Sequence, residues 1–144
     1  REDLDHWRKV GLPENLHLHG FVAPSEVPGW HTRCDALLLP SQSEVYGASR
    51  GVPIGDVMSP LKLFEYMASG KPIVSSDLPV LREILRHGEN ALLVPPHDVV
   101  AWKEALEQLD SDPSLAHNLA QRARQDLTDN YTWDARATSV LRGL

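Results

Sequence analysis

Short apolar segments alternate with amphipathic segments along most of this chain, and this alternation restricts the possible folds more than any other feature. Strands are expected at residues 16–22, 36–39, 72–76 and 91–94. Helices are expected at residues 25–33, 60–69 and 78–87, and from Asp98, Pro113 and Thr132 onwards. Units of strand, helix and strand close by right-handed crossovers into a parallel sheet. The sequence therefore predicts an α/β fold with a Rossmann-like parallel sheet flanked by helices.

One strand, one tryptophan and one edge of the sheet carry more specific expectations. The run 36–39 is apolar without a break, which is typical of a strand buried on both faces of a parallel sheet. We expect Trp133 to pack the terminal helix. Ligands of such sheets bind beyond the carboxyl ends of the strands, so Val22, Ser41 and Asp77 should share one edge of the molecule.

Length and composition narrow the class of protein. The 144 residues are enough for one domain, spanning the whole chain, with a sizeable core. A net charge of −6 argues against a nucleic-acid-binding protein, although a nucleotide needs only one local positive site. The single cysteine, Cys34, excludes an internal disulfide and a multi-cysteine metal site. No apolar run approaches the roughly 18 residues of a membrane helix.

Residues 59–77 form the most informative segment, because they combine helix signals with a strand. Ser59 suits the N-cap position, and Pro60 suits the first helical position, where its missing N–H is not needed. Gly70 suits the position just after the helix. The apolar run that begins at Pro72 then predicts a buried strand.

The start of this expected helix suits a sugar nucleotide. Free N–H groups and a partial positive charge at a helix N-terminus favour an anion, and Lys62 adds a full charge in the first turn. Phosphates would therefore contact Ser59, Lys62 or the backbone N–H groups of Leu61 and Lys62. Helical side chains lean toward the N-terminus, so Glu65 can accept hydrogen bonds from ribose hydroxyls beside those phosphates.

The same segment resembles a family. Residues 59–72 resemble the donor-binding segment of the retaining glycosyltransferases of family 4, the glycosyl transferases group 1, which have the two-domain GT-B fold. The resemblance continues through residues 76–77, 82–83 and 88–96, and upstream through residues 18–22 and 35–41. It covers nearly the whole chain, and the order and spacing of the blocks make it far more specific than any single block.

The resemblance implies roles for individual residues. It places Glu65 at the position of the family's ribose-binding glutamate and Val22 where backbone atoms hold the nucleobase. Leu61 would pack near the base or the ribose. The donor would be a UDP-, GDP- or ADP-sugar, with no cofactor and no metal. His17 and His19 have a spacing that two metal ligands can use, but no third ligand is obvious.

One part of the family pattern is broken. The family often carries an acid eight positions before the ribose-binding glutamate, and that position is Val57 here. Either Glu44 supplies this contact to the donor sugar across a loop insertion, or the chain belongs to a subgroup without the first acid. The second explanation is preferred.

The resemblance also implies a larger enzyme. The chain would be the C-terminal half of a GT-B fold, truncated at its N-terminus and lacking the N-terminal acceptor-binding domain. The complete enzyme would transfer a sugar to an acceptor hydroxyl with retention, as the resemblance implies. We expect a cytoplasmic enzyme, with peripheral membrane association as an option, and an inactive isolated fragment. The alternatives are a non-catalytic nucleotide-binding or assembly module on a degenerate domain and, less favoured, a sugar-nucleotide epimerase.

Overall fold

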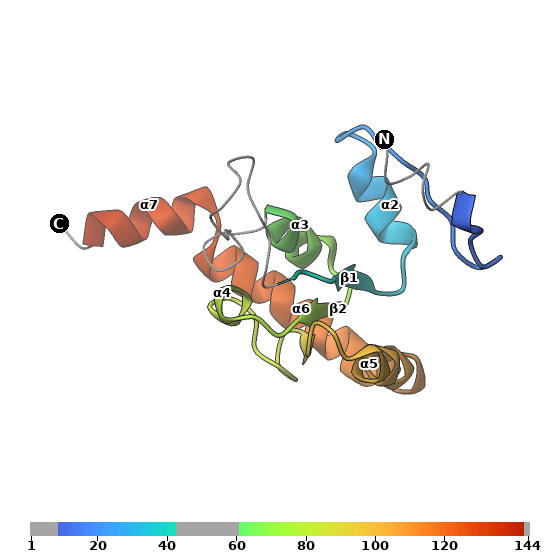
Figure 1. The fold of residues 1–144 in the computed structure, drawn as a ribbon. Coiled ribbons are helices and arrows are strands. Elements are labelled where there is room, and N and C mark those ends of the chain that lie inside the picture. Colours follow the sequence, from blue (N-terminus) through green and yellow to red (C-terminus); the bar gives the residue numbers. More distant parts are fainter. Residues whose placement is uncertain (1–8, 43–60, 143–144) are drawn as a thin grey trace, which may run out of the picture.

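The computed structural model describes residues 9–42 and 61–142 of the chain (Figure 1). The helices and strands in chain order are α2 (Val27–Arg33), β1 (Leu37–Leu39), α3 (Leu61–Ser69), β2 (Ile73–Ser76), α4 (Pro79–Arg82), β3 (Leu92–Val94), α5 (Val99–Ser111), α6 (Pro113–Asn130) and α7 (Trp133–Arg142). This order confirms the predicted alternation of strands and helices and the α/β fold class.

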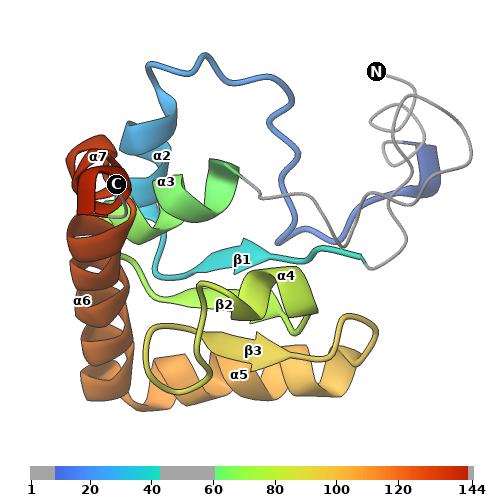
Figure 2. The same ribbon diagram turned by 90° about the vertical axis from the view of Figure 1, so that its left-hand side faces the viewer.

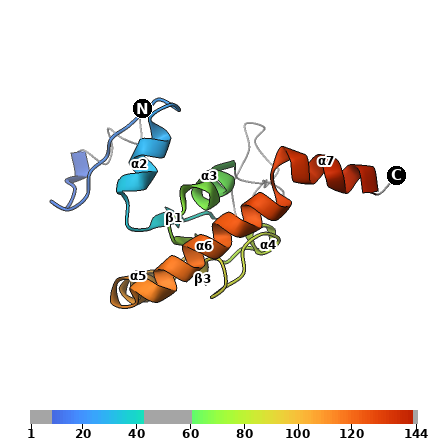
Figure 3. The same cartoon turned by 180° about the vertical axis from the view of Figure 1, so that it is seen from behind.

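The three described strands form one parallel sheet in the order β1-β2-β3. Leu38 of β1 lies opposite Val74, and Val74 lies opposite Leu92. Figure 2 shows α3 and α4 on one side of this sheet, α5 on the other, and α6 across the end where the strands begin. Seen from behind, α6 runs between α5 and α7 (Figure 3).

Because β2 is the middle strand, its alternating side chains enter two different cores. Ile73 packs with Leu63 and Met67 of α3 and with apolar side chains around α4. Val74 packs on the opposite face with Leu92 and with side chains of α5 and α6. All four β2 residues are buried, as expected for the central strand.

The predicted strand at residues 16–22 is wrong, since the structure shows no strand there. A strand needs a hydrogen-bonded neighbour, and within the described residues β1 pairs only with β2. β1 is therefore an edge strand, and its Leu38 side chain is 39% exposed instead of buried on both faces. Residues 16–22 run as an irregular segment toward α2.

The helix predicted at residues 78–87 is shorter than expected. Only Pro79–Arg82 is helical, and the chain then turns toward β3. The amide of Arg86 donates to the Asn90 side chain at 2.7 Å, so it is not available for a continuing helical ladder. Gly88 adopts a φ of 75° in the turn that follows.

The three C-terminal helices begin at the predicted positions, each with a side-chain cap. The Asp98 side chain accepts a hydrogen bond from the Ala101 amide at 3.0 Å, and Asp112 caps α6 in the same way. Thr132 caps α7 by accepting from the Ala135 amide at 3.2 Å. Trp133 is 87% exposed, so it does not pack α7 against the described residues. No described helix is both long and apolar enough to cross a membrane.

Two glycine substitutions should have opposite effects on stability. A Cβ at Gly88 or at Gly29 would meet no other atom within 4 Å, so crowding is excluded at both positions. Gly88→Ala should lower the free energy of unfolding by about 1–2 kcal/mol, because Gly88, unlike Gly29, has a positive φ. Gly29→Ala in α2 should raise it by about 0.5–1 kcal/mol. Urea unfolding followed by tryptophan fluorescence measures both; a loss of stability in both variants would contradict this explanation.

Candidate functional site

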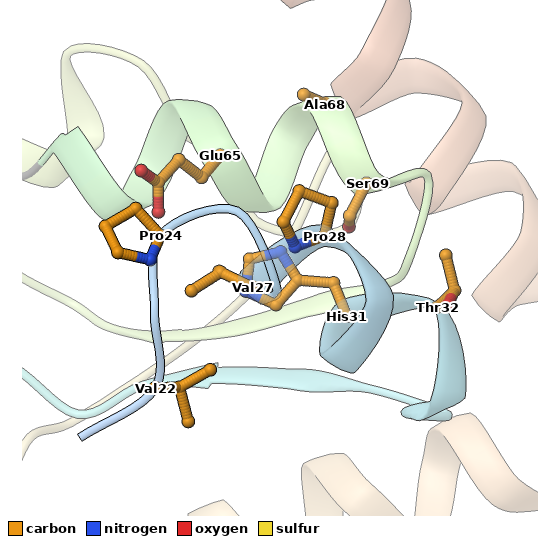
Figure 4. Close-up of a pocket in the computed structure, with 9 residues that line it drawn as sticks. All are labelled: Val22, Pro24, Val27, Pro28, His31, Thr32, Glu65, Ala68 and Ser69. Atoms are coloured by element: carbon orange, nitrogen blue, oxygen red, sulfur yellow. The ribbon is translucent and has the colours of Figure 1, made fainter.

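A pocket of about 490 Å³ lies between α2 and α3 (Figure 4). Its wall combines the segment before α2, one side of α2 and one side of α3. The lining residues are Val22, Pro24, Val27, Pro28, His31, Thr32, Glu65, Ala68 and Ser69. Most of these side chains are apolar, with a few polar groups among them, a composition typical of small-molecule sites.

The pocket brings together two residues that the sequence singled out from distant segments. Val22 lies on the segment before α2, and Glu65 lies on α3. Figure 4 shows the Glu65 carboxylate reaching from α3 toward the segment that carries Pro24. Within the described residues this carboxylate makes no protein hydrogen bond, so it is free to accept one from a ligand.

The remaining predicted site residues lie elsewhere. Leu61 and Lys62 occupy the first turn of α3, are exposed and do not line the pocket. Ser59 and Glu44 lie outside the described residues. Val57, the position of the broken pattern, also lies outside them.

The orientation of α3 follows from its burial pattern. Leu63 and Met67 are fully buried against the sheet, which fixes one face of the helix in the core. Glu65, Ala68 and Ser69 lie on a different face and therefore line the pocket. The register of the apolar residues in α3 thus positions Glu65.

The α2 wall contributes His31, which the sequence analysis did not single out. The His31 ring meets the Tyr66 ring edge-on, with the centroids 5.3 Å apart and the planes at 90°. Burial, followed by the nearby negative charge of Glu65, raises the pKa of Tyr66 above its ordinary value. The phenol therefore stays neutral beside the pocket.

Two of the polar groups in the pocket wall already have protein partners. The Thr32 hydroxyl donates to the Gly29 carbonyl at 2.9 Å. The Ser69 hydroxyl donates to the Tyr66 carbonyl at 2.6 Å and accepts from the Lys71 amide at 3.2 Å. Glu65 and His31 are thus the polar lining residues whose side chains make no hydrogen bond to another described residue.

Asp77 follows β2 but is occupied by an ion pair. Arg82 donates to both Asp77 carboxylate oxygens, at 2.5 and 2.6 Å. This hydrogen bonding from Arg82 holds the pKa of Asp77 below its ordinary value. The pair joins the end of β2 to α4, which is a structural role, and Asp77 does not line the pocket.

Known proteins resemble this chain over most of its length. Residues 2–126 match the family model described as Glycosyl transferases group 1. A glycogen synthase of Mycobacterium tuberculosis is 29% identical over 137 residues, which are 95% of this chain and 30% of that protein. The chain thus spans about a third or less of the length of the curated relatives it matches.

Solved structures share the fold. The C-terminal domain of a glycosyl transferase group 1 family protein from Francisella tularensis superimposes with a TM-score of 0.67 at 26% identity, covering 92% of this chain and 62% of that one. An Anabaena protein in complex with UDP-glucose superimposes with a TM-score of 0.71 at 19% identity, covering 99% of this chain and 36% of that one. The chain therefore belongs to the glycosyl transferases group 1 family, and its fold matches the C-terminal domain of GT-B enzymes.

Proposed function

We propose that this chain binds a nucleoside-diphosphate sugar and that the complete enzyme transfers the glycosyl group to an acceptor hydroxyl with retention. The proposal rests on one observation: Val22 and Glu65, which are 43 positions apart in the sequence, line the same pocket. Membership of a glycosyltransferase family supports it. The complex of a similarly folded Anabaena protein with UDP-glucose is consistent with this class of ligand.

The donor is proposed to lie along α3. Its ribose hydroxyls donate to the Glu65 carboxylate, and its base enters the apolar part of the pocket beside Val22 and Pro24. The diphosphate lies toward the start of α3, where Lys62 and the helix N-terminus favour negative charge. Glu65 follows Lys62 by three residues, about one helical turn, so one nucleotide can contact both.

The chemistry proposed for this part of the enzyme is stabilisation of the leaving diphosphate. Transfer of the sugar builds negative charge on the departing phosphate oxygens, and preorganised positive groups lower the barrier when they meet that charge. We propose that Lys62 and the start of α3 fill this role without a divalent metal. The acceptor site is proposed to come from a separate N-terminal domain of a longer chain.

Lys62→Gln should weaken the binding of a nucleoside diphosphate about threefold to tenfold, the range expected for the loss of one phosphate contact. The variant should also show a weaker dependence of affinity on salt, because one charge–charge contact is gone. NMR titrations of the 144-residue chain with UDP, GDP and ADP measure the dissociation constants. Lys71→Gln, just beyond the other end of α3, is the matched control. Equal losses in both variants would contradict the proposed phosphate position.

A further inference from the structure

Among the described pocket residues, His31 and Glu65 are the polar side chains that make no hydrogen bond to another described residue. We infer that His31 hydrogen-bonds the nucleobase of the donor and sets the preference among bases. This inference rests on the proposed function, because it assigns the base to a particular part of the same pocket. It gives a role to a residue that belongs to no recognised motif of the sequence.

Position and surroundings favour this role. Figure 4 shows His31 on the α2 wall and Glu65 on α3, which lie on opposite sides of the pocket. A ribose held by Glu65 can therefore direct its base toward α2. The side chains of Val22, Pro24 and Val27 give this region apolar walls, against which the flat face of a base can pack.

Within the described residues, the His31 ring has a packing partner but no hydrogen-bond partner. The edge-on contact with Tyr66 orients the imidazole. No described residue forms a hydrogen bond with either ring nitrogen. A neutral imidazole has one donor and one acceptor nitrogen, and the nucleobases present their donors and acceptors at different positions along the edge. In a half-buried apolar setting, a base that pairs with His31 is favoured over one that leaves it unpaired.

The test separates the contribution of the base from that of ribose and phosphate. Dissociation constants of ribose 5-phosphate, UMP, GMP and AMP are measured by NMR titration of the 144-residue chain. The base increment is the ratio of the constant for ribose 5-phosphate to that for each nucleotide. His31→Phe keeps an aromatic ring beside Tyr66 but removes the hydrogen bond, whereas His31→Gln keeps a donor and an acceptor. His117→Phe, on the exposed surface of α6, is the matched control.

His31→Phe should reduce the largest base increment about threefold to tenfold, the loss expected for one hydrogen bond, and leave ribose 5-phosphate binding unchanged. His31→Gln should restore at least part of that increment, and His117→Phe should change nothing. Thermal unfolding curves confirm that each variant is folded before it is titrated. An undiminished base increment in His31→Phe would overturn the inference while leaving the proposed function intact. If the wild-type chain binds none of these ligands, the proposed function fails and the inference fails with it.

Discussion

Asp126→Ala is expected to lower the free energy of unfolding by about 2–4 kcal/mol, the range for breaking a mostly buried charged network. The Asp126 side chain is only 10% exposed. It accepts from Asn90 at 2.8 Å, from Arg86 at 2.6 Å and from Arg122 at 2.9 Å. Without it, the Asn90 amide loses one of its two acceptors, and Asn90 is fully buried. This network joins the turn before β3 to α6, so its loss should loosen both.

Asp129→Ala is the matched control, because Asp129 lies one turn further along α6 and is exposed. Its side chain accepts a hydrogen bond from the Gln125 side chain on the same helix at 2.8 Å. We expect its effect to stay within about 0.5 kcal/mol. Urea unfolding of both variants at neutral pH measures the difference. Similar stabilities of the two variants would show that the network contributes little.

The pH dependence of this penalty follows from the pKa of Asp126. Burial alone would raise this pKa, but the three donated hydrogen bonds outweigh burial and hold it below the ordinary value of 3.8. A carboxyl group with a lowered folded pKa contributes stability above its unfolded pKa and loses it as pH falls through the folded pKa. The difference in the free energy of unfolding between wild type and Asp126→Ala should therefore be largest near neutral pH and should shrink below pH 3.8.

Glu65→Gln is expected to weaken nucleoside-diphosphate binding by about tenfold or more, because hydrogen bonds to a charged acceptor are stronger than those to a neutral amide. The substitution keeps the size of the side chain and leaves the core residues of α3 untouched. Binding of ribose 5-phosphate should weaken by a similar factor, since the proposed contact is with the ribose. The base increments should stay unchanged, which distinguishes Glu65 from His31.

Glu104→Gln on the exposed surface of α5 is the control for this substitution. Calorimetric or NMR titrations of both variants with UDP, GDP and ADP give the affinities. If nucleotide affinity is equal in wild type and in Glu65→Gln, the ribose does not bind Glu65. The proposed orientation of the donor along α3 would then be wrong.

The elements predicted correctly are those with a strong local pattern. β3 is a short apolar run and β2 begins with one, and the two strands pair in the parallel sheet that the alternation of strands and helices predicts. α5 begins after Asp98 and α6 begins at Pro113, as the sequence predicts. In α3, Leu63 and Met67 share the helical period of the core, which fixes where Glu65 points. Such features depend on neighbours within a few residues.

The errors arise where distant neighbours decide the structure. Residues 16–22 alternate like a strand, but in the described part of the chain no strand lies beside them to accept their hydrogen bonds. The helix after Leu78 ends early because the Asn90 side chain captures the Arg86 amide. Trp133 has the helical spacing of a core residue but is exposed among the described residues.

The candidate site was predicted only in part for the same reason. Glu65 and Val22 were identified from the sequence, and the structure places both on one pocket, while their roles remain predictions. His31 was missed because its place depends on the packing of α2 against α3. The pairing of Asn90 with Asp126, 36 positions apart in sequence, was missed because no local pattern links the two residues.

The central claim is that the pocket between α2 and α3 binds the nucleotide of a sugar donor. An NMR titration of the ¹⁵N-labelled 144-residue chain with UDP, GDP and ADP tests it most directly. The account predicts saturable shifts that cluster at Val22, at His31 and at residues 61–65, with one nucleotide binding more tightly than the others. A folded chain whose pocket signals do not move with any of the three nucleotides would contradict the claim and favour a non-catalytic assembly module.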